Sequence, residues 1–403
     1  MIMKTGTSFK GSKIFTFFIR TGMLLFAIGI GTGIFLLLTW AGQKNKGPLD
    51  DLLQSADYRI SRMEKNVLGK DERDSRSSEL QWFYKYRTNK ILFNTIDTVL
   101  LGAFDDNTAE SYESITALED SIETKLPIIS IYTAWGSKKT EVFPLLRAQA
   151  IADLGSIPLI TWEPWLDDFD PQEFPFMADK KNKNLNGMKE IAEGKFDPYI
   201  DKWAKAAHQF GNPFILRFGH EMNDPYRYPW GPQNNKPEEF IAAWQHVVDR
   251  FKSDGADNTL WLWSPHPAYL TYPQFYPGHK YVDWIGVTTL NYGTVATWSQ
   301  WWTFDEIFGK FYDSVSLYKK PMMITEIGCL PVGGDRAAWL SNAIQSLPQK
   351  YPAVKGMVFF HATNDNTTTY KSLDWSFESD KPTTEAVKKS ILNWKNLIKT
   401  HPG

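Results

Sequence analysis

The stretch PFILRFGHEMN at residues 213–223 and the stretch PMMITEIG at residues 321–328 are the strongest architectural signals in the chain. Each is an apolar run that ends in a glutamate, Glu221 in the first and Glu326 in the second. Runs that are apolar throughout, without polar alternation, are typical of parallel strands buried on both faces. The two stretches therefore predict two strands of a parallel sheet, each with an acid at its carboxyl end.

Six further runs of this kind occur along the chain, and amphipathic stretches separate many of them. In chain order the eight runs are Thr98–Phe104, Pro127–Trp135, Ile157–Trp165, Pro213–His220, Thr259–Pro265, Val282–Thr289, Pro321–Ile327 and Lys355–His361. The helical patterns include Phe196–Phe210, Pro237–Lys252, Asp305–Tyr318, Asp335–Leu347 and Pro382–Ile398. Eight alternations over roughly 300 residues predict an α/β fold, a (β/α)8 TIM barrel at residues 95–403. A doubly wound open sheet is the alternative, although no GxGxxG loop follows an early run.

The amino-terminal part of the chain predicts an anchor and a tether. Residues 1–20 carry four cations and no acid, and residues 21–40 are uncharged and mostly apolar. At about 1.5 Å per residue, this second run spans roughly 30 Å, the thickness of a bilayer core. The preceding cations favour a cytoplasmic amino terminus, which predicts a single-pass cell-membrane protein with an extracellular or periplasmic domain. A cleaved signal peptide is the alternative. Residues 41–94 are polar and charged, which is typical of a juxtamembrane tether.

Composition excludes some classes of function and favours others. The formal net charge of −2 indicates no basic face for nucleic acid. Aromatic residues make up 15% of the chain, which fits either sugar-stacking surfaces or a large aromatic core. The single cysteine, Cys329, rules out an intramolecular disulfide, and we interpret it as an apolar filler instead of a nucleophile. The histidines show no ligand spacing, so we expect neither a metal nor a cofactor.

The acids at the two strand ends predict the chemistry. In a (β/α)8 barrel, the loops after the strands form the active-site face, so Glu221 and Glu326 are expected at the mouth. Retaining cleavage of a β-glycoside needs one protonated carboxyl for the leaving oxygen and one ionised carboxylate as nucleophile. We expect surroundings that raise the pKa of Glu221, donors that keep Glu326 ionised, and Arg217 as a charge partner. Either glutamate alone is also consistent with a helix cap or a surface ion pair.

These residues resemble a known family. The order Arg-x-x-His-Glu-Met-Asn at residues 217–223 and the ITEIG sequence at residues 324–328 are similar to family 26 of the glycoside hydrolases, which contains β-mannanases and lichenases. The resemblance covers roughly residues 95–398 and implies retaining endo-hydrolysis without a metal. It also implies a role for each of several residues. These are Glu221 as acid/base, Glu326 as nucleophile, Arg217, His220 and Asn223 as active-site contacts, and Tyr292 as a hydrogen-bond donor to the nucleophile.

One feature departs from the family pattern. Where the family carries an aromatic platform at the end of the eighth strand, this chain reads FFHATND at residues 359–365. Either His361 replaces that ring or Phe360 supplies it, which leaves the identity of the sugar open.

Further aromatic residues at strand ends predict a glycan groove. Candidate stacking residues are Trp162, Trp165, Trp230 and Trp263, and for each one core packing is the alternative. Glu163 between the first two indoles is either an acceptor for a sugar hydroxyl or part of a buried ion pair.

The combined features predict an endo-β-glycanase that acts on mannan, mixed-linkage β-glucan or an exopolysaccharide. The predicted anchor adds a membrane contact through residues 21–40 and favours a position near polysaccharide synthesis or export machinery. A non-catalytic polysaccharide-binding or assembly protein on the same barrel is the alternative, which the presence of both glutamates disfavours. Transglycosylation uses the same two residues and differs only in the access of water.

Overall fold

The computed structural model describes residues 70–400 except residues 110, 297–298 and 370. Its contacts divide the chain into a unit at Met1–Lys70 and a unit at Asp71–Gly403, and only the second is described here. The predicted anchor at residues 21–40 lies outside the described residues. Among the helices that the structure does describe, none combines the length and hydropathy needed to cross a bilayer.

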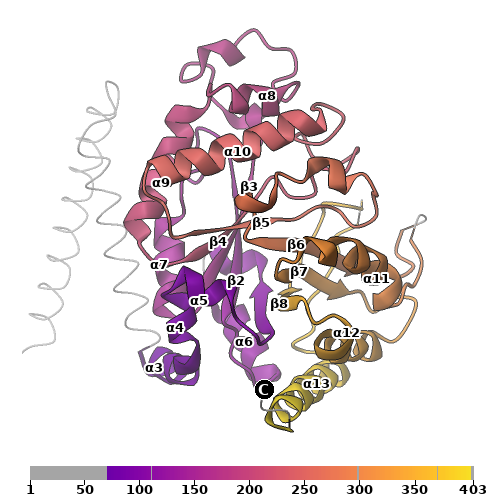
Figure 1. The fold of residues 1–403 in the computed structure, drawn as a ribbon. Helices are drawn as coiled ribbons and strands as arrows, with labels where there is room; N and C mark the ends of the chain where they lie inside the picture. Colours follow the sequence, from indigo (N-terminus) through magenta and orange to yellow (C-terminus); the bar gives the residue numbers. More distant parts are fainter. Residues whose placement is uncertain (1–69, 110, 297–298, 370, 401–403) are drawn as a thin grey trace, which may run out of the picture. The chain divides into compact units, whose positions relative to one another are not determined.

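The eight predicted strands are present, and they form a closed parallel barrel in sequence order (Figure 1). They are β1 (Leu100–Phe104), β2 (Ile128–Ala134), β3 (Ile157–Glu163), β4 (Phe214–Phe218), β5 (Thr259–Trp263), β6 (Trp284–Asn291), β7 (Met322–Cys329) and β8 (Val354–Phe360). Closure is completed by the pairing of β1 with β8, from Leu100 opposite Gly356 to Phe104 opposite Phe360. The prediction of a (β/α)8 barrel is confirmed, and the open-sheet alternative is excluded.

Helices connect the strands and cover the outside of the barrel. The α-helices that follow β1 are α6 (Glu113–Ser121), α7 (Leu145–Asp153), α8 (Gly187–Ala192), α9 (Asp197–Phe210), α10 (Pro237–Ser253), α11 (Phe304–Val315), α12 (Arg336–Lys350) and α13 (Lys381–Thr400). Local sequence fixes their ends. Thr303, for example, caps α11 by accepting the N–H of Glu306, and the Glu306 carboxylate accepts the N–H of Thr303 in return.

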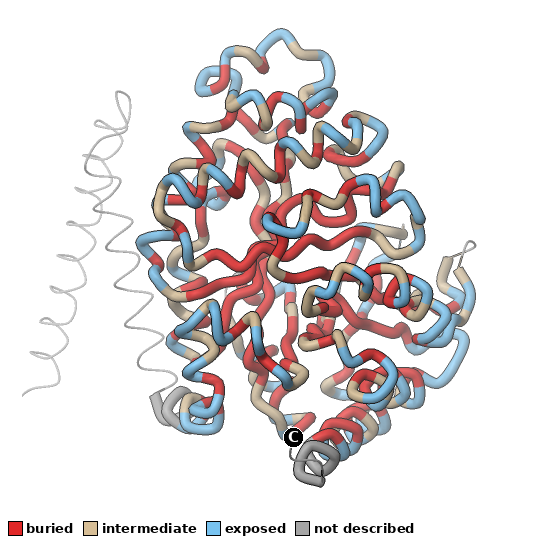
Figure 2. Tube along the Cα trace, viewed as in Figure 1, coloured by how far each residue is buried: buried red, intermediate tan, exposed pale blue. Residues whose placement is uncertain are grey.

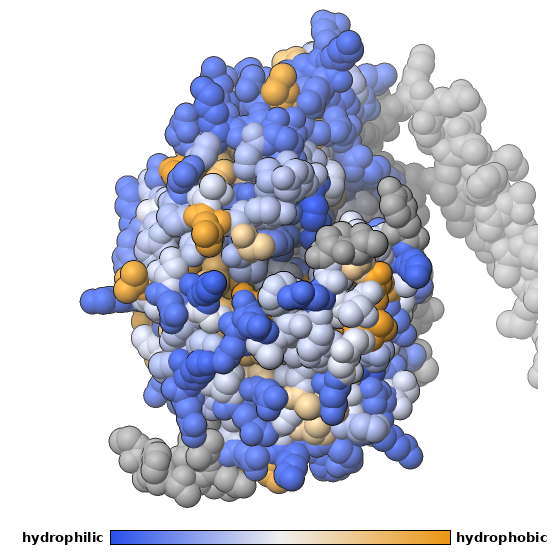
Figure 3. Space-filling view, turned by 90° about the vertical axis from the view of Figure 1, so that its right-hand side faces the viewer, coloured by the Kyte–Doolittle hydropathy of each residue, from blue (hydrophilic) through white to orange (hydrophobic). Residues whose placement is uncertain are grey.

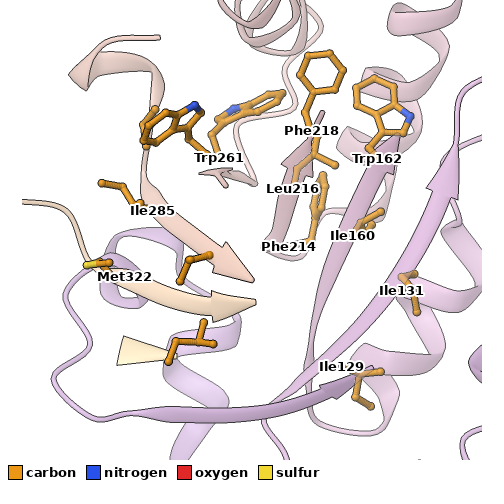
Figure 4. Close-up of a cluster of buried hydrophobic side chains, with 14 of the residues drawn as sticks. Ile129, Ile131, Ile160, Trp162, Phe214, Leu216, Phe218, Trp261, Ile285 and Met322 are labelled. Atoms are coloured by element: carbon orange, nitrogen blue, oxygen red, sulfur yellow. The ribbon is translucent and has the colours of Figure 1, made fainter. Parts of the chain in front are cut away.

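The core has two layers because successive strand residues point to opposite sides. Buried residues concentrate in the strands, and exposed residues lie on the outer sides of the helices (Figure 2). Ile129, Ile160 and Leu216 belong to the layer between strands and helices, part of which is drawn in Figure 4. Their neighbours Ile128 and Ile215 belong to a separate buried cluster with residues of the amino-terminal helices. On the face drawn in Figure 3, hydrophilic residues predominate and hydrophobic ones form small separate patches.

Residues 71–94 belong to this unit, which corrects the prediction of a tether extending to residue 94. They form α3 (Lys70–Glu79), α4 (Tyr84–Arg87) and α5 (Lys90–Asn94). Phe83 and Phe93 are fully buried and share a hydrophobic cluster with residues from all eight strands. Sequence reasoning missed this packing because only a few apolar residues, within a charged stretch, make the contacts with the barrel. Residues 41–69 lie outside the described part of the chain.

The contact of α3 with the barrel is polar as well as apolar. Arg76 is 1% exposed, and its guanidinium donates to both carboxylate oxygens of Glu119 in α6, at 2.6 to 3.2 Å. The same side chain donates to the carbonyl oxygen of Leu126 and to the hydroxyl of Ser156, each at 2.9 Å. A buried ion pair of this kind is maintained only when further hydrogen bonds satisfy both groups. This one ties α3 to α6 and to the loops before β2 and β3.

Candidate active site

Glu326 lies within β7 and is 8% exposed. Its Oε1 accepts a hydrogen bond from Arg217 Nη1 at 2.6 Å and one from Tyr132 Oη at 2.8 Å. The pairing of β7 with β8 is irregular between Ile324 and Ile327, the segment that contains this glutamate. A cation and a phenol therefore solvate the carboxylate in a place that water scarcely reaches.

Arg217 on β4 is fully buried, and its Nη2 lies 3.3 Å from the hydroxyl of Thr288 on β6. Burial opposes its charge, but Glu326, Tyr132 and Glu221 outweigh burial and raise its pKa above the ordinary arginine value. The guanidinium is therefore a permanent cation at the centre of the mouth, as the sequence predicted.

Tyr132 is a functional residue that sequence reasoning missed. It lies near the carboxyl end of β2, where burial and the neighbouring Glu326 raise its pKa well above 10, so the phenol remains a donor. The available signal was its position, since it is a hydroxyl-bearing residue near the end of an otherwise apolar run. The predicted donor to the nucleophile was Tyr292, whose Oη lies 3.1 Å from the hydroxyl of Thr368.

Glu221 follows β4 and is 2% exposed. Its φ of 53° is in the left-handed region, which a non-glycine residue adopts at a cost, and its N–H donates to the carbonyl of Ser264 at 2.7 Å. Arg227 Nη1 lies 3.6 Å from its Oε2. Among the described residues that oxygen has no hydrogen-bond partner.

The charge environment of Glu221 differs from the predicted one. Burial raises the pKa of its carboxyl, but the nearby His266, Arg227 and Arg217 outweigh burial and leave the pKa below its ordinary value. In the free site Glu221 is therefore an ionised carboxylate, whereas we expected surroundings that keep it protonated. Arg227 was absent from the predicted site because the loop that carries it has no regular pattern.

His220 and Trp230 form one supporting unit. Trp230 is buried, its Nε1 donates to the carbonyl of His220 at 2.7 Å, and its ring stacks on Tyr228. The phenol of Tyr228 lies 3.1 Å from His220 Nε2. Burial and nearby cations hold the pKa of His220 well below its ordinary value, so its imidazole is neutral. Trp230 thus positions the histidine and does not offer a free face for a sugar.

Two other predicted stacking residues are in the core. Trp162 packs face to face on Trp203 of α9 with ring centroids 4.2 Å apart, and it is fully buried on the helix side of β3. Trp263 is equally buried and packs edge to face on Tyr276. Core packing, the alternative for each, is therefore correct. Trp165 remains partly exposed.

Glu163 is the last residue of β3 and is a third carboxyl in the mouth. Its Oε2 accepts from Trp165 Nε1 at 3.2 Å. Burial raises its pKa to about 7, against the lowering effect of that indole and of Arg217. Near neutral pH this carboxyl is thus present in both forms and can donate as well as accept.

Two further predicted contacts have structural roles. The amide of Asn223 donates to the carbonyls of His266 and Tyr269 and accepts the N–H of His266, so its hydrogen bonds join two loops. His361 is 1% exposed, with Nδ1 3.2 Å from Asp105 and Nε2 2.7 Å from Glu378.

The ring at the end of β8 is therefore Phe360, the second of the two options for the platform. It is partly exposed and stacks on Phe104 with ring centroids 5.3 Å apart. Near these rings, Tyr292 packs edge to face on Trp375 at 5.0 Å. Aromatic side chains from β1, β8 and the loop after β6 thus share one part of the mouth.

A metal is not favoured by the charges of this site. Within the described residues, Glu221, Asp224 and His266 are the one group whose ligand atoms all lie within 4.8 Å of one another. The guanidinium of Arg227 stands 3.6 Å from the first of them. A positive charge at that distance opposes a second cation.

Comparisons with known proteins identify the family of the chain. The model of glycosyl hydrolase family 26 matches residues 76–374. Endoglucanase H of Acetivibrio thermocellus is 30% identical over 293 residues, covering 70% of this chain and 29% of that protein. A mannan endo-1,4-β-mannosidase of Bacillus subtilis is 27% identical over 225 residues, covering 52% of this chain and 56% of the relative. The chain therefore spans less than two thirds of either relative.

Solved structures show the shared fold. The mannanase man26 of Bacillus subtilis superposes with a TM-score of 0.52 at 20% identity, over 73% of this chain and 85% of that one. A GH26 β-mannanase from Bacteroides ovatus gives a TM-score of 0.53 at 15% identity, over 78% and 92% of the two chains.

Proposed function

Since the chain belongs to glycosyl hydrolase family 26, we propose that it cleaves a β-linked polysaccharide internally, with Glu326 as nucleophile and Glu221 as acid/base. The asymmetry between the two carboxylates carries the proposal. Glu326 is held by Arg217 and Tyr132, as a nucleophile must be held. Glu221 keeps one buried oxygen without a hydrogen-bond partner among the described residues, as a group that exchanges a proton with the substrate requires.

The first step forms a covalent intermediate. The Glu326 carboxylate attacks the anomeric carbon, and the bond from that carbon to the glycosidic oxygen breaks as Glu221 transfers its proton to the leaving oxygen. Arg217 and Tyr132 orient the nucleophile and then hold its ester oxygen. The proton on Glu221 must be acquired when substrate enters, because the free site favours the ionised form.

The second step restores the enzyme. Glu221, now a carboxylate, removes a proton from water, and the resulting oxygen attacks the anomeric carbon and releases Glu326. Two inversions at the same carbon retain the β configuration. The cations near Glu221 that oppose the first step favour the carboxylate that the second step needs.

For the substrate we propose a β-glucan first and β-mannan second. Of the two relatives described above, the one with the higher identity is named an endoglucanase and the other a mannosidase. Among the rings considered from the sequence for stacking a hexose, Phe360 and Trp165 are the ones that stay partly exposed.

Incubation with lichenan, mannan, β-1,3-xylan and an exopolysaccharide tests this function. We expect new reducing ends from at least one polymer, with lichenan first, and none from the Glu326→Ala variant. Oligosaccharides of mixed length should appear early, since the cuts are internal. Equal activity in wild type and Glu326→Ala, with intact folding of both, contradicts the assignment.

We also propose that residues 21–40 anchor the enzyme in the cell membrane, with the barrel outside the cytoplasm near machinery for polysaccharide synthesis or export. The support is the uncharged run and the cations before it. The full chain should remain in the membrane fraction after alkaline carbonate extraction, and deletion of residues 1–40 should release it. Extraction of the full chain by carbonate contradicts the anchor.

A further inference from the structure

The segment after β8 extends across the mouth of the barrel. We call residues 365–369 the strap. Asp365 fixes its first end, because its backbone exchanges hydrogen bonds with Leu373 at 2.9 and 3.0 Å and its carboxylate accepts from Trp375 Nε1 at 2.9 Å. The carboxylate also accepts the N–H of Thr367 at 2.9 Å, which sets the turn that follows.

The strap contacts side chains from two other loops. The hydroxyl of Thr368 lies 3.1 Å from Tyr292 Oη, in the loop after β6. The hydroxyl of Thr367 accepts from Arg227 Nη2 at 3.3 Å, in the loop after β4. Strands β4 and β8 lie opposite each other in the barrel order, so this second contact bridges the mouth.

Arg227 connects the strap to the acid/base. Its Nη1 lies 3.6 Å from Glu221 Oε2, and its guanidinium lies 5.1 Å from the centre of the Tyr228 ring. The side chain of the acid/base Glu221 is itself 2% exposed. A leaving-group oxygen must come within hydrogen-bond distance of Glu221 to receive a proton. The guanidinium beside Oε2 restricts the space that this oxygen would occupy.

We propose that Arg227 is a positioning residue that joins the strap to Glu221, so that an entering polysaccharide displaces both and frees the acid/base to take up the proton it donates. This inference rests on the proposed function and adds to it a closed conformation of the enzyme without substrate. The strap covers the catalytic centre until the sugar occupies it.

The electrostatics of the site support this coupling. Burial raises the pKa of Glu221, but Arg227, together with His266 and Arg217, outweighs burial and keeps this pKa below its ordinary value. The titratable and charged groups that act on Glu221 come from several elements. They are Arg217 on β4, Asp224, Arg227 and Tyr228 after β4, His266 and Tyr269 after β5, and Tyr292 after β6. Of the cations among them, Arg227 is the one hydrogen-bonded to the strap.

The pH dependence of Arg227→Met tests the coupling. The profile of kcat/KM reports ionisation of the free enzyme, and the profile of kcat reports ionisation of the substrate complex. We expect the basic limb of kcat/KM to move to higher pH in the variant, while the basic limb of kcat stays in place. If neither basic limb moves, the proposal is overturned, because Arg227 then does not affect the pKa of Glu221. If both limbs shift equally, it is also overturned, because Arg227 then stays beside Glu221 in the substrate complex.

Two controls separate this test from the proposed function. Arg250→Met removes a guanidinium that pairs with Asp201 far from the mouth, and both of its profiles should match wild type. Difference infrared spectroscopy titrates Glu221 directly and needs no turnover. Wild type is compared with Glu221→Gln, and Arg227→Met is compared with Arg227→Met/Glu221→Gln. Glu221 should titrate at higher pH without Arg227. An identical titration overturns the coupling even if every polymer in the panel resists cleavage.

The strap itself is tested by Thr367→Val/Thr368→Val. The double variant loses the contacts with Arg227 and Tyr292 and also the hydrogen bond from the Thr367 hydroxyl to Asp365 within the strap. This loss should ease opening and lower KM by at least about fivefold at unchanged kcat, the equivalent of one hydrogen bond. Thr369→Val is the matched control, because that hydroxyl bonds to Lys371 at the end of the same segment. A higher KM in the double variant overturns the role of the strap as a cover, since the threonines would then be binding the sugar.

Discussion

Single residues at the mouth differ mainly in what solvates their charges. Glu326 receives two donors, one a fixed cation, whereas Glu221 is surrounded by cations that do not fully hydrogen-bond it. Glu163 forms no salt bridge with the described residues, and burial raises its pKa to about 7. Three acids within one barrel mouth therefore have three different chemical characters, set by neighbours from five strands or their loops.

The Tyr132→Phe variant removes one donor to the nucleophile and keeps the ring. We expect kcat to fall by roughly 10- to 100-fold, the equivalent of one charge-assisted hydrogen bond. Tyr199→Phe serves as the control, because that phenol donates to the carbonyl of Glu141 outside the mouth, and its kcat should match wild type. An unchanged kcat in Tyr132→Phe shows that the phenol does not serve the nucleophile.

The Glu163→Gln variant tests the third carboxyl through stability. Burial raises the pKa of Glu163 from 4.5 to about 7, so between these values the folded state binds more protons than the unfolded state. The free energy of unfolding of wild type therefore falls as pH rises through this window. In the variant we expect that fall to be smaller by on the order of 2 kcal/mol, measured by urea unfolding at both ends of the window. An equal fall in both proteins contradicts the raised pKa.

At the scale of elements, strand alternation explains which predictions succeeded. The apolar runs revealed all eight strands. Glu221 follows β4 as predicted, whereas β7 continues past Glu326 to Cys329, so this glutamate lies within its strand and not at the end of it. The same alternation places Trp162 and Glu163 on opposite sides of β3, so once Glu163 faces the mouth the indole must face the helices. Loop residues such as Arg227 were not predictable, because their positions depend on contacts between loops from different strands.

The amino-terminal helices also contain a buried residue whose role could not be predicted from the sequence. A buried arginine within the charged stretch at residues 70–76 resembles a solvated one in sequence, and only its partner Glu119 in α6 reveals its role. The Arg76→Met variant leaves that carboxylate buried without its cation, and we expect the free energy of unfolding to fall by about 3–5 kcal/mol. Adding Glu119→Gln should recover part of the loss. A chemical denaturation curve for Arg76→Met that matches wild type contradicts the contribution of α3 to the barrel.

At the scale of the whole molecule, the barrel brings β4 and β7 into one mouth and leaves the opposite end closed by Phe83 and Phe93. This arrangement assigns chemistry to one face and stability to the other, as in other barrels of this class. The family match from residue 76 onward agrees with the physical boundary at Asp71. The central claim is that the two glutamates act by double displacement.

The anomer of the first product tests that claim most directly. Proton NMR of a polymer that the wild type cleaves, recorded before mutarotation equilibrates the new reducing ends, distinguishes the two stereochemical courses. We predict that the β-anomer appears first and that the α-anomer grows in afterwards at the rate of spontaneous mutarotation. Initial formation of the α-anomer contradicts a covalent intermediate on Glu326 and the mechanism built on it.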